Sequence, residues 1–404
     1  MVKSHTEAPV GIALSELSDV VENDAAIRRV MRLQPAGGRG DKLYPPTYPG
    51  VRANDPAQQI FEERRIDGQQ VKCVLLDSVQ SQANRLEEAL LRAVRSGRFS
   101  LPMVAVDFVG CSKDGMDLSD LGAITSLEAP HRIFDAIIRD SVLDGTRFTD
   151  TADYRQLMLA KPDNALEVFR LSPTSLLFGV WNSTGEGGGL GAKFTRCLVS
   201  EIIGVGADPG ISGAVRLDPL GIRATVKLVG GPLDYEVVKQ DVRGKKTVRP
   251  SEVNHSNVIS TPVERGVTVD YALHTAVVTC AGLRRLSFPG AASDAAGRVV
   301  LAALGLAALK EQDVSGYALR SRCDLVPEQA ASFEVVHPEG GTTAFEMSRG
   351  EASDLVRQAS EHARSSGYPW PEEPVRLVPQ ERLIELVVAS REIALAADGD
   401  GAER

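Results

Sequence analysis

The sequence is poor in the residue types that build metal centres and disulfide frameworks. It holds six histidines, and no two of them show the His-x-x-x-His spacing of a helical metal site. Its five cysteines form no Cys-x-x-Cys pair and stand far apart, at Cys73, Cys111, Cys197, Cys280 and Cys323. These spacings argue against zinc clusters, and the odd cysteine count argues against a disulfide framework. We therefore expect no metal and no other cofactor.

A long hydrophobic run is also missing. The longest one extends from Val299 to Leu309 and contains Gly305, so it falls well short of the roughly 20 residues that cross a bilayer. Residues 1–13 are polar and acidic and contain no apolar signal core. We expect a cytoplasmic protein that has no membrane partner.

The chain has no surplus of basic charge either, since its net charge is −9. The acidity is concentrated at one end: residues 324–404 carry 16 acidic and 7 basic side chains, whereas residues 1–323 carry 38 of each sign. Because phosphate contacts depend on local lysines and arginines, residues 1–323 can still hold a basic groove. We therefore separate a body, 1–323, from an acidic, mainly helical C-terminal region, 324–404.

Hydrophobic periodicity predicts helices and strands in alternation. Helices are expected over 15–33, 78–95, 130–143, 194–203, 291–310, 350–365 and 378–397. Strands are expected over 71–76, 103–109, 175–181, 213–238, 267–280, 316–322 and 332–337. Strands interleaved with helices and separated by long loops indicate an α+β fold with large insertions.

The start of the expected helix 78–95 is rich in polar side chains. Ser78, Gln82 and Arg85 follow at i, i+4 and i+7 and share one face, and Asn84 lies beside them. The N-terminus of a helix suits a phosphate, and amide and guanidinium groups donate to phosphate and sugar oxygens. A polar face turned to water explains the same residues, so both interpretations stay open.

Two glycine-rich segments invite comparison with ligand-binding loops. In residues 37–48, Arg39 and Lys42 supply charge next to glycines and two tyrosines, although a loop packed by its tyrosines and prolines fits as well. In residues 184–193, Lys193 follows Ala192, so the Gly-Lys-Ser/Thr ending of a phosphate-binding loop is absent. We expect a passage for a polymer backbone beside Lys193 and Arg196; a nucleotide-using enzyme is a rival.

Two further segments combine basic residues with histidine. The loop 239–257 contains Lys245, Lys246 and Arg249 among its five basic residues, and it is either a solvated surface or an arm that grips nucleic acid. In the segment 130–135, His131 and Asp135 have helical spacing that could orient a general base, but no nucleophile or metal partner can be assigned.

Taken in order, five blocks of the sequence resemble one family. They are LQPAGGRGDKLYPPTY at 33–48, LLDSVQSQANRLEEALL at 75–91, HRIFDAIIRDS at 131–141, FGVWNSTGEGGGLGAKFTRCLVSEIIG at 178–204 and RPSEVNHSNV at 249–258. The set is similar to the signature blocks of the type I-G (formerly I-U) CRISPR-associated RAMP protein, the backbone subunit of a Cascade-type interference complex.

The resemblance implies a fold and a set of partners. The fold would be a modified RNA-recognition-motif (ferredoxin-like) palm with inserted finger and thumb elements and a helical C-terminal region, the loop 239–257 being a possible thumb. Several copies would line up along the spacer of one CRISPR RNA with other Cascade subunits, and would meet target DNA through the guide. Such a subunit is not an enzyme, and it must hold every spacer without reading its bases.

The residues expected to contact the guide combine this resemblance with their chemistry. They are Arg39, Lys42, Gln82, Asn84, Arg85, His131, Arg132, Lys193, Arg196, Lys245, Lys246, Arg249, His255 and Asn257. Trp181 is either a core residue or a contact. The alternative function is a RAMP-type, metal-independent endoribonuclease that processes precursor CRISPR RNA with His131 or His255 as acid or base.

Overall fold

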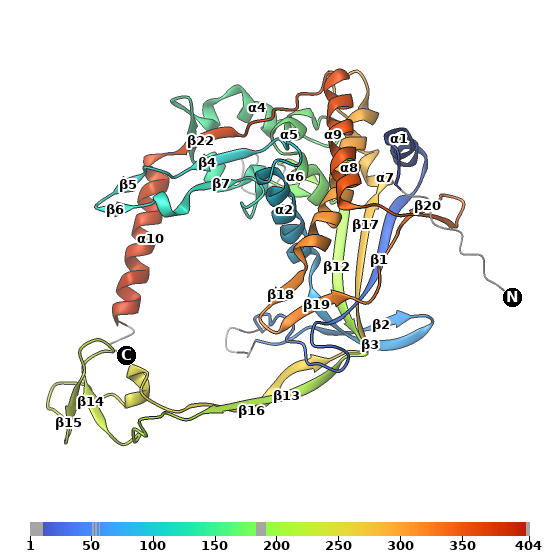
Figure 1. Ribbon diagram of the computed structural model, residues 1–404. Helices are drawn as coiled ribbons and strands as arrows, with labels where there is room; N and C mark the ends of the chain where they lie inside the picture. The colour runs from blue at the N-terminus through green and yellow to red at the C-terminus, as the bar shows by residue number, and fades with distance from the viewer. Residues whose placement is uncertain (1–10, 51, 53–54, 56, 183–190, 401–404) are drawn as a thin grey trace.

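The computed structural model describes residues 11–50, 52, 55, 57–182 and 191–400, with the side chains of all of these except 259–263 and 396–400. Its centre is a curled antiparallel sheet (Figure 1). The strands follow the order β18 (Tyr317–Arg320), β19 (Cys323–Pro327), β1 (Ala26–Pro35), β17 (Tyr271–Thr279), β12 (Leu198–Val205), β3 (Gln69–Asp77) and β2 (Phe61–Ile66). A further hairpin pairs with β1, formed by β20 (Phe333–Val336) and β21 (Thr342–Phe345).

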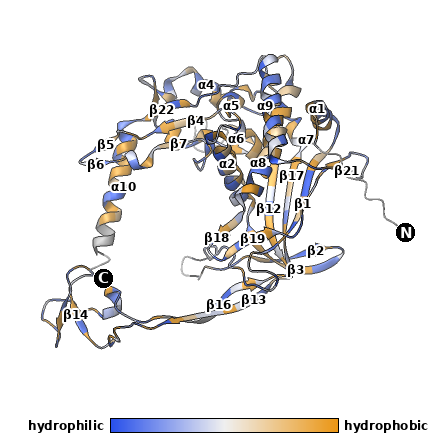
Figure 2. Ribbon diagram, in the orientation of Figure 1, coloured by the Kyte–Doolittle hydropathy of each residue, from blue (hydrophilic) through white to orange (hydrophobic). Residues whose placement is uncertain are grey.

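Two helices, α2 (Val79–Arg95) and α8 (Asp294–Ser315), lie on the same side of this sheet (Figure 1). The Ser78 side chain caps the N-terminus of α2 by accepting a hydrogen bond from a backbone N–H of the first turn. Apolar residues of α2 recur at steps of three and four, so a stripe that includes Leu86 and Leu90 is buried. α8 is buried along most of its length, and hydrophobic residues gather where it meets the sheet (Figure 2).

The order of these elements is that of a ferredoxin-like fold. β1, α2, β12, β17, α8 and then β19 with β20 follow one another as β-α-β-β-α-β. In the sheet, the last strands lie beside β1, and β17 and β12 follow on its other side. The predicted α+β class is confirmed, and the topology is consistent with a modified RNA-recognition-motif palm. β3 and β2 extend this core at one edge.

The first insertion, residues 96–197, joins α2 to β12 and builds a five-stranded sheet with help from the C-terminal region. Its strand order is β7 (Ala123–Thr125), β4 (Val104–Asp107), β22 (Val375–Pro379), β8 (Ser141–Leu143) and β9 (Thr146–Arg147). The helices of this insertion are α3 (Ala136–Arg139), α4 (Ala152–Met158), α5 (Leu166–Leu171) and α6 (Pro173–Phe178). Its smaller elements are β5 (Ser112–Lys113), β6 (Met116–Asp117), η1 (Ser119–Leu121), η2 (Arg132–Phe134), η3 (Phe148–Asp150), β10 (Val180–Trp181) and β11 (Lys193–Phe194).

The second insertion, residues 206–270, joins β12 to β17 and leaves the body as an extended arm (Figure 1). β13 (Asp208–Arg216) and β16 (Val258–Thr268) pair antiparallel along it. We call residues 217–257 the tip. They contain β14 (Lys227–Val229), β15 (Glu236–Val238) and the 3₁₀ turn η4 (Pro250–Val253), which surround an apolar cluster of Leu228, Val248 and Val253 with Val226.

The acidic C-terminal region is packed into the body. β20 pairs with β1, β22 runs parallel to β4, and α9 (Arg349–Ser365) packs against α8. Only α10 (Glu381–Asp400) projects away from the sheets (Figure 1). Position 324 therefore separates two charge compositions, whereas the packing is continuous across it. The helices α1 (Leu14–Asn23) and α7 (Cys280–Leu283) also contact α8.

Five predicted elements are wrong. The strand expected over 213–238 is a strand only at 213–216, 227–229 and 236–238. The helix expected over 15–33 ends at Asn23, and the chain continues as β1, in which alternate residues are buried from Ile27 to Leu33. The helix expected over 194–203 is strand β12. The strand expected over 175–181 is α6 followed by the short β10, and the helix expected over 130–143 shrinks to η2 and α3 before β8. At β1 and β12 the sheet pairs residues that lie far apart in the sequence, which local periodicity does not record.

A buried polar network joins the sheet to both helices. His274 of β17 is fully buried, and its Nε2 lies 2.7 Å from Ser200 Oγ on β12. Ser200 donates to Gln82 Oε1 at 2.9 Å, and Gln312 of α8 donates to the same oxygen at 3.2 Å. Ser200 therefore accepts from His274 Nε2–H, and burial together with the nearby Arg29 lowers the pKa of His274 to about 3.

We expect His274 to make the fold sensitive to acid. The unfolded chain binds a proton at this residue below about pH 6.5, whereas the folded chain does so only near pH 3, so stability is lost as the pH falls through this window. At pH 5 the loss amounts to about 2 kcal/mol. Urea unfolding at pH 7 and pH 5 should therefore show a smaller decrease for His274→Gln than for the wild type. The exposed His131→Gln is the control, and an equal decrease in all three proteins would contradict the assignment.

Candidate nucleic-acid interface

Arg132 and Glu87 form an ion pair between η2 and α2. Arg132 Nε lies 2.6 Å from Glu87 Oε1 and Arg132 Nη2 lies 2.8 Å from Glu87 Oε2, so the pair is bidentate. Arg132 Nη1 also donates to the carbonyl oxygen of Gly179 at 2.9 Å. Burial raises the pKa of Glu87 to about 7, and Arg132 opposes this rise. All three guanidinium nitrogens of Arg132 thus donate hydrogen bonds inside the protein, and they hold the segment before β10 against α2.

Arg196 packs closely against Gly179. Among the described residues its guanidinium has no ion-pair partner, and its Nε is buried without a hydrogen bond. Burial and the nearby Arg132 lower the pKa of Arg196. Gly179 has a φ of +78°, and a Cβ there would lie 3.0 Å from Arg196 Cγ and from Phe194 O. Only glycine permits this close approach without strain.

Trp181 and Lys193 stand opposite each other on the β10–β11 ladder. Their neighbours Val180 and Phe194 are buried, while Lys193 is exposed and Trp181 keeps 50% of its surface accessible. Lys193 Nζ lies 5.3 Å from the centre of the indole ring. The sequence left open whether Trp181 is a core residue or a contact residue, and its exposure excludes the core position.

The structure brings together the predicted residues of the third and fourth blocks. His131 is exposed and directly precedes η2, and Arg132 contacts Gly179 next to Arg196. We call the group formed by Arg132, Glu87, Gly179, Arg196 and the Trp181–Lys193 pair the arginine cluster. The sequence did not single out Glu87, because it lies 45 positions from Arg132. The glycine passage predicted before Lys193 falls mostly on 183–190, outside the described residues.

The first block forms the root of the arm. Lys42 Nζ donates to the carbonyl oxygen of Ile211 at 2.8 Å, and the Tyr44 hydroxyl lies 2.5 Å from Ser212 Oγ. Arg322 donates to the same hydroxyl and stacks over the Tyr44 ring. Lys42 and Tyr44 therefore attach β13 to the body. Arg39, at a more exposed position, pairs with Glu328 at 3.3 Å.

The predicted residues of the fifth block lie on the tip. Lys245, Lys246 and Arg249 have exposed side chains, and the backbone of Arg249 caps η4. His255 Nε2 lies 2.9 Å from the Tyr235 hydroxyl, and Asn257 accepts a hydrogen bond from the backbone N–H of Asp218 at 2.7 Å. The last two side chains thus help to shape the tip.

The second block corrects one of the predicted contacts. Gln82 is fully buried in the network with Ser200, so its side chain is not available to a ligand in this structure. Arg85 pairs with the buried Asp77 at 2.9 Å, which gives it a structural partner. Asn84 alone is exposed. The shared face that suggested a phosphate site is instead the face on which α2 packs against β3 and β12.

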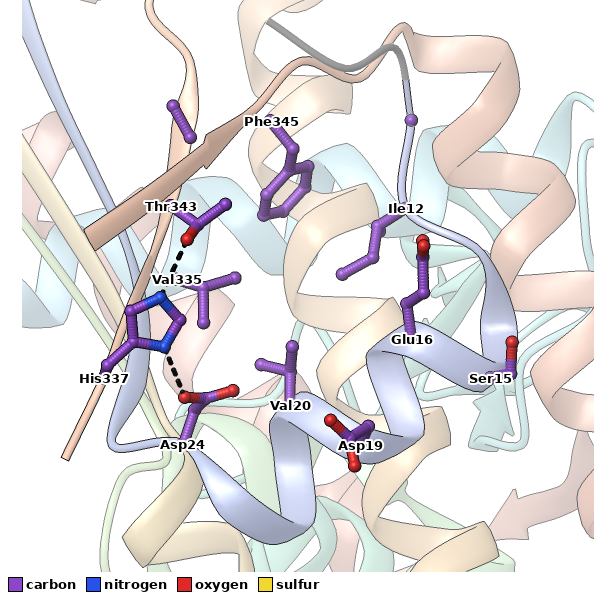
Figure 3. A pocket seen from close by; sticks show the side chains of 12 residues that line it. Ile12, Ser15, Glu16, Asp19, Val20, Asp24, Val335, His337, Thr343 and Phe345 are labelled. Carbon is purple, nitrogen blue, oxygen red and sulfur yellow. Dashed lines mark hydrogen bonds and ion pairs between the residues drawn. The ribbon is translucent and has the colours of Figure 1, made fainter. Parts of the chain in front are cut away.

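A cavity of about 560 Å³ between α1 and the β20–β21 hairpin is unsuited to RNA (Figure 3). His337 bridges Asp24 and Thr343, with Nδ1 2.7 Å from Asp24 Oδ1 and Nε2 2.8 Å from Thr343 Oγ1. The order carboxylate, imidazole, hydroxyl is that of a hydrolytic triad. Glu16 and Asp19 line the same cavity, however, and their charge would oppose both an oxyanion and a phosphate. We interpret the bridge as a link between α1 and the hairpin.

The described residues hold no group of three or more histidine, cysteine, aspartate or glutamate side chains that could bind a metal ion. Over the same residues, no helix has both the length and the apolar surface needed to cross a membrane. The arginine cluster, the root of the arm and the tip therefore remain as the places where predicted ligand contacts gather.

Residues 27–209 match a family model described as CRISPR-associated protein GSU0053. This stretch, less than half of the chain, is therefore similar to a CRISPR-associated protein family. It runs from β1 to the start of β13 and includes the arginine cluster, the root residues Lys42 and Tyr44, and the palm strands β1, β2, β3 and β12. The match ends where the arm begins. No curated protein matches the chain.

We expect Gly179→Ala to disturb the arginine cluster. The new Cβ would meet backbone atoms of Phe194 and Arg196 at 3.0 Å in addition to the strain of the positive φ, which should cost about 2–3 kcal/mol of unfolding free energy. Gly97→Ala is the matched control, because Gly97 has a φ of +72° and open space around it. Equal losses of unfolding free energy in the two variants would show that the close approach at Gly179 does not contribute to stability.

Proposed function

We propose that this protein is a non-catalytic backbone subunit of a type I CRISPR interference complex, of the type I-G RAMP kind. It holds the spacer part of CRISPR RNA independently of sequence, assembles in several copies along it and leaves bases free to pair with target DNA. The observation that carries the proposal is the arm. In a chain of CRISPR-associated type, it emerges between two neighbouring strands of a ferredoxin-like palm and ends in a tip with exposed basic residues.

The attachment of the arm supports a gripping role. Leu43 pairs with Val267 through two backbone hydrogen bonds of 2.8 and 2.7 Å, and the side chains of Lys42 and Tyr44 bind β13. A two-stranded ribbon is marginally stable by itself in water. The root contacts fix the direction in which the ribbon leaves the body, so the tip can reach a molecule that the palm does not touch.

The surface of the arm supports assembly with a further copy. Large apolar side chains stay exposed along it, and hydrophobic and hydrophilic residues are interspersed there (Figure 2). They are Ile211, Val215, Leu217, Leu220, Leu233, Val237 and Val258. Exposed apolar groups gathered on a protruding element indicate a surface that is buried in an assembly. We propose that this partner is the next copy on the same guide.

Sequence-independent binding follows from the types of side chain available. Arg196, Lys193, Lys245 and Arg249 can bind phosphates, whose charge is the same in every spacer. Other Cascade subunits would supply guide processing and cleavage. The endoribonuclease alternative has less support. His255 lies on the tip, where its Nε2 is 2.9 Å from the Tyr235 hydroxyl, and His131 lies on the body, where only its backbone N–H donates to Asp135. Among the described contacts, neither imidazole has a carboxylate partner that would orient it as a general base.

We expect the affinity for single-stranded RNA to fall steeply with salt and to depend little on sequence. Each phosphate neutralised by a lysine or arginine releases condensed cations, so several contacts produce a logarithmic slope of several units. Filter binding of three unrelated 30-mers between 50 and 300 mM salt measures both properties. A flat salt dependence, or a preference of more than tenfold for one sequence, would contradict the proposal.

We expect reversal of charge on the tip to weaken assembly. Lys245→Glu/Lys246→Glu removes two positive charges and adds two negative ones on an exposed loop, so the fold should survive while RNA affinity drops by about tenfold or more. The matched control is Lys161→Glu/Arg147→Glu, which makes the same change at exposed positions of the first insertion. Sedimentation measures the size and yield of the particles that the wild type and each variant form with a guide RNA. If the tip variant forms particles of the same size and yield as the wild type, the tip does not bind the guide.

A further inference from the structure

The arginine cluster contains two groups that the protein itself does not satisfy. Trp181 exposes half of its surface, although indole is among the side chains that gain most from burial. Arg196 has a buried Nε without a hydrogen bond, and no described carboxylate pairs with its guanidinium. Buried donors are nearly always paired in folded proteins, so such a group needs an explanation.

Glu87 is a carboxylate whose charge acts on Arg196, and its geometry explains why it forms no ion pair with that residue. Both oxygens of Glu87 are engaged by Arg132, at 2.6 and 2.8 Å. Arg132 has a backbone φ of +52°, which non-glycine residues rarely adopt, and its Nη1 donates to the carbonyl oxygen of Gly179. The cluster thus has two arginines for one carboxylate. Arg132 acts as a positioning residue, and Arg196 has no ion-pair partner of its own among the described residues.

The two groups are connected through the short stretch from Gly179 to Trp181. Arg196 packs against Gly179, and Trp181 follows two residues later. Two residues of extended chain span about 7 Å, a length that one nucleotide bridges from its phosphate to its base. Lys193 stands beside the indole ring and adds a second cation at the same place.

We propose that the arginine cluster is a subsite for one nucleotide of single-stranded RNA, in which Arg196 binds the phosphate and Trp181 stacks on the base. Stacking on an aromatic ring tolerates every base, because each has a π-face. A guanidinium matches a phosphate with two parallel hydrogen bonds. The subsite therefore adds affinity without adding sequence preference. This inference rests on the proposed function, and it assigns one position at which the protein holds the guide RNA.

Tryptophan fluorescence can test the stacking directly, because the chain has only two tryptophans. Trp370 is buried and donates to Ser100 Oγ, so a ligand in solution does not reach it. Titration of oligo(U) and oligo(A) into the full chain should quench the emission of Trp181. Trp181→Phe should abolish the quenching while keeping affinity within about twofold, and Trp181→Ala should weaken binding by about 5- to 100-fold.

The phosphate contact has its own readout. Arg196→Gln should lower the logarithmic salt slope by about one unit, and Arg196→Lys should restore the slope but only part of the affinity. Arg147→Gln, an exposed arginine of β9, is the control and should change neither quenching nor affinity. An oligonucleotide that lacks its bases should bind with the wild-type slope and without quenching.

The outcomes separate the subsite from the function. If the wild type binds no RNA, the proposed function fails. If it binds RNA with a steep salt slope, but Trp181→Ala binds as tightly as the wild type or Arg196→Gln keeps the full slope, the subsite is overturned while the function stands. Quenching that persists in Trp181→Phe would equally overturn the assignment of the base to Trp181.

Discussion

Arg29 of β1 is the largest fully buried side chain of the described structure, and its guanidinium pairs with Asp313 of α8 at 2.7 Å. It also lies over the ring of Phe333 in β20, 5.3 Å from the ring centre. A buried charge costs several kcal/mol unless it is paired, so β1, α8 and β20 have to meet in one arrangement. This single constraint joins the N-terminal strand of the palm to elements nearly 300 positions later in the chain.

The remaining architecture depends on that arrangement. Once β1 is fixed between β17 and the C-terminal strands, β12 and β17 become neighbours, and the insertion between them has to leave the sheet as an arm. The first insertion is placed by α2, whose Glu87 reaches Arg132 and thereby orients Gly179 and Arg196. The arm and the arginine cluster are therefore both consequences of how the palm closes, although neither belongs to its four-stranded core.

Sequence reasoning succeeded where local periodicity and packing agree. The helices α2, α8 and α9 were predicted within a few residues, because each has an apolar stripe or an apolar length that a helix buries. It failed at β1 and β12, whose residues also fit a helical pattern and become strands only through partners elsewhere in the chain. At the candidate site it recognised the cationic residues but not their roles. Arg85, Arg132 and Arg196 look alike in the sequence, yet the first two are bound by Asp77 and Glu87 and only the third is unpaired among the described residues.

By itself, the sequence determined the chemical inventory of this protein: spaced blocks rich in glycine, arginine, lysine and amides, no ligand pattern for a metal, and acidity confined to residues 324–404. It also determined the order of the blocks that resemble one family. The tertiary structure decided which of those side chains face outward. Gln82 became part of the core and Trp181 became exposed because their neighbours come from strands and helices more than ten positions away. Pairing between distant segments removes some charges and polar groups from reach and leaves others unpaired, and local sequence carries no record of those partners.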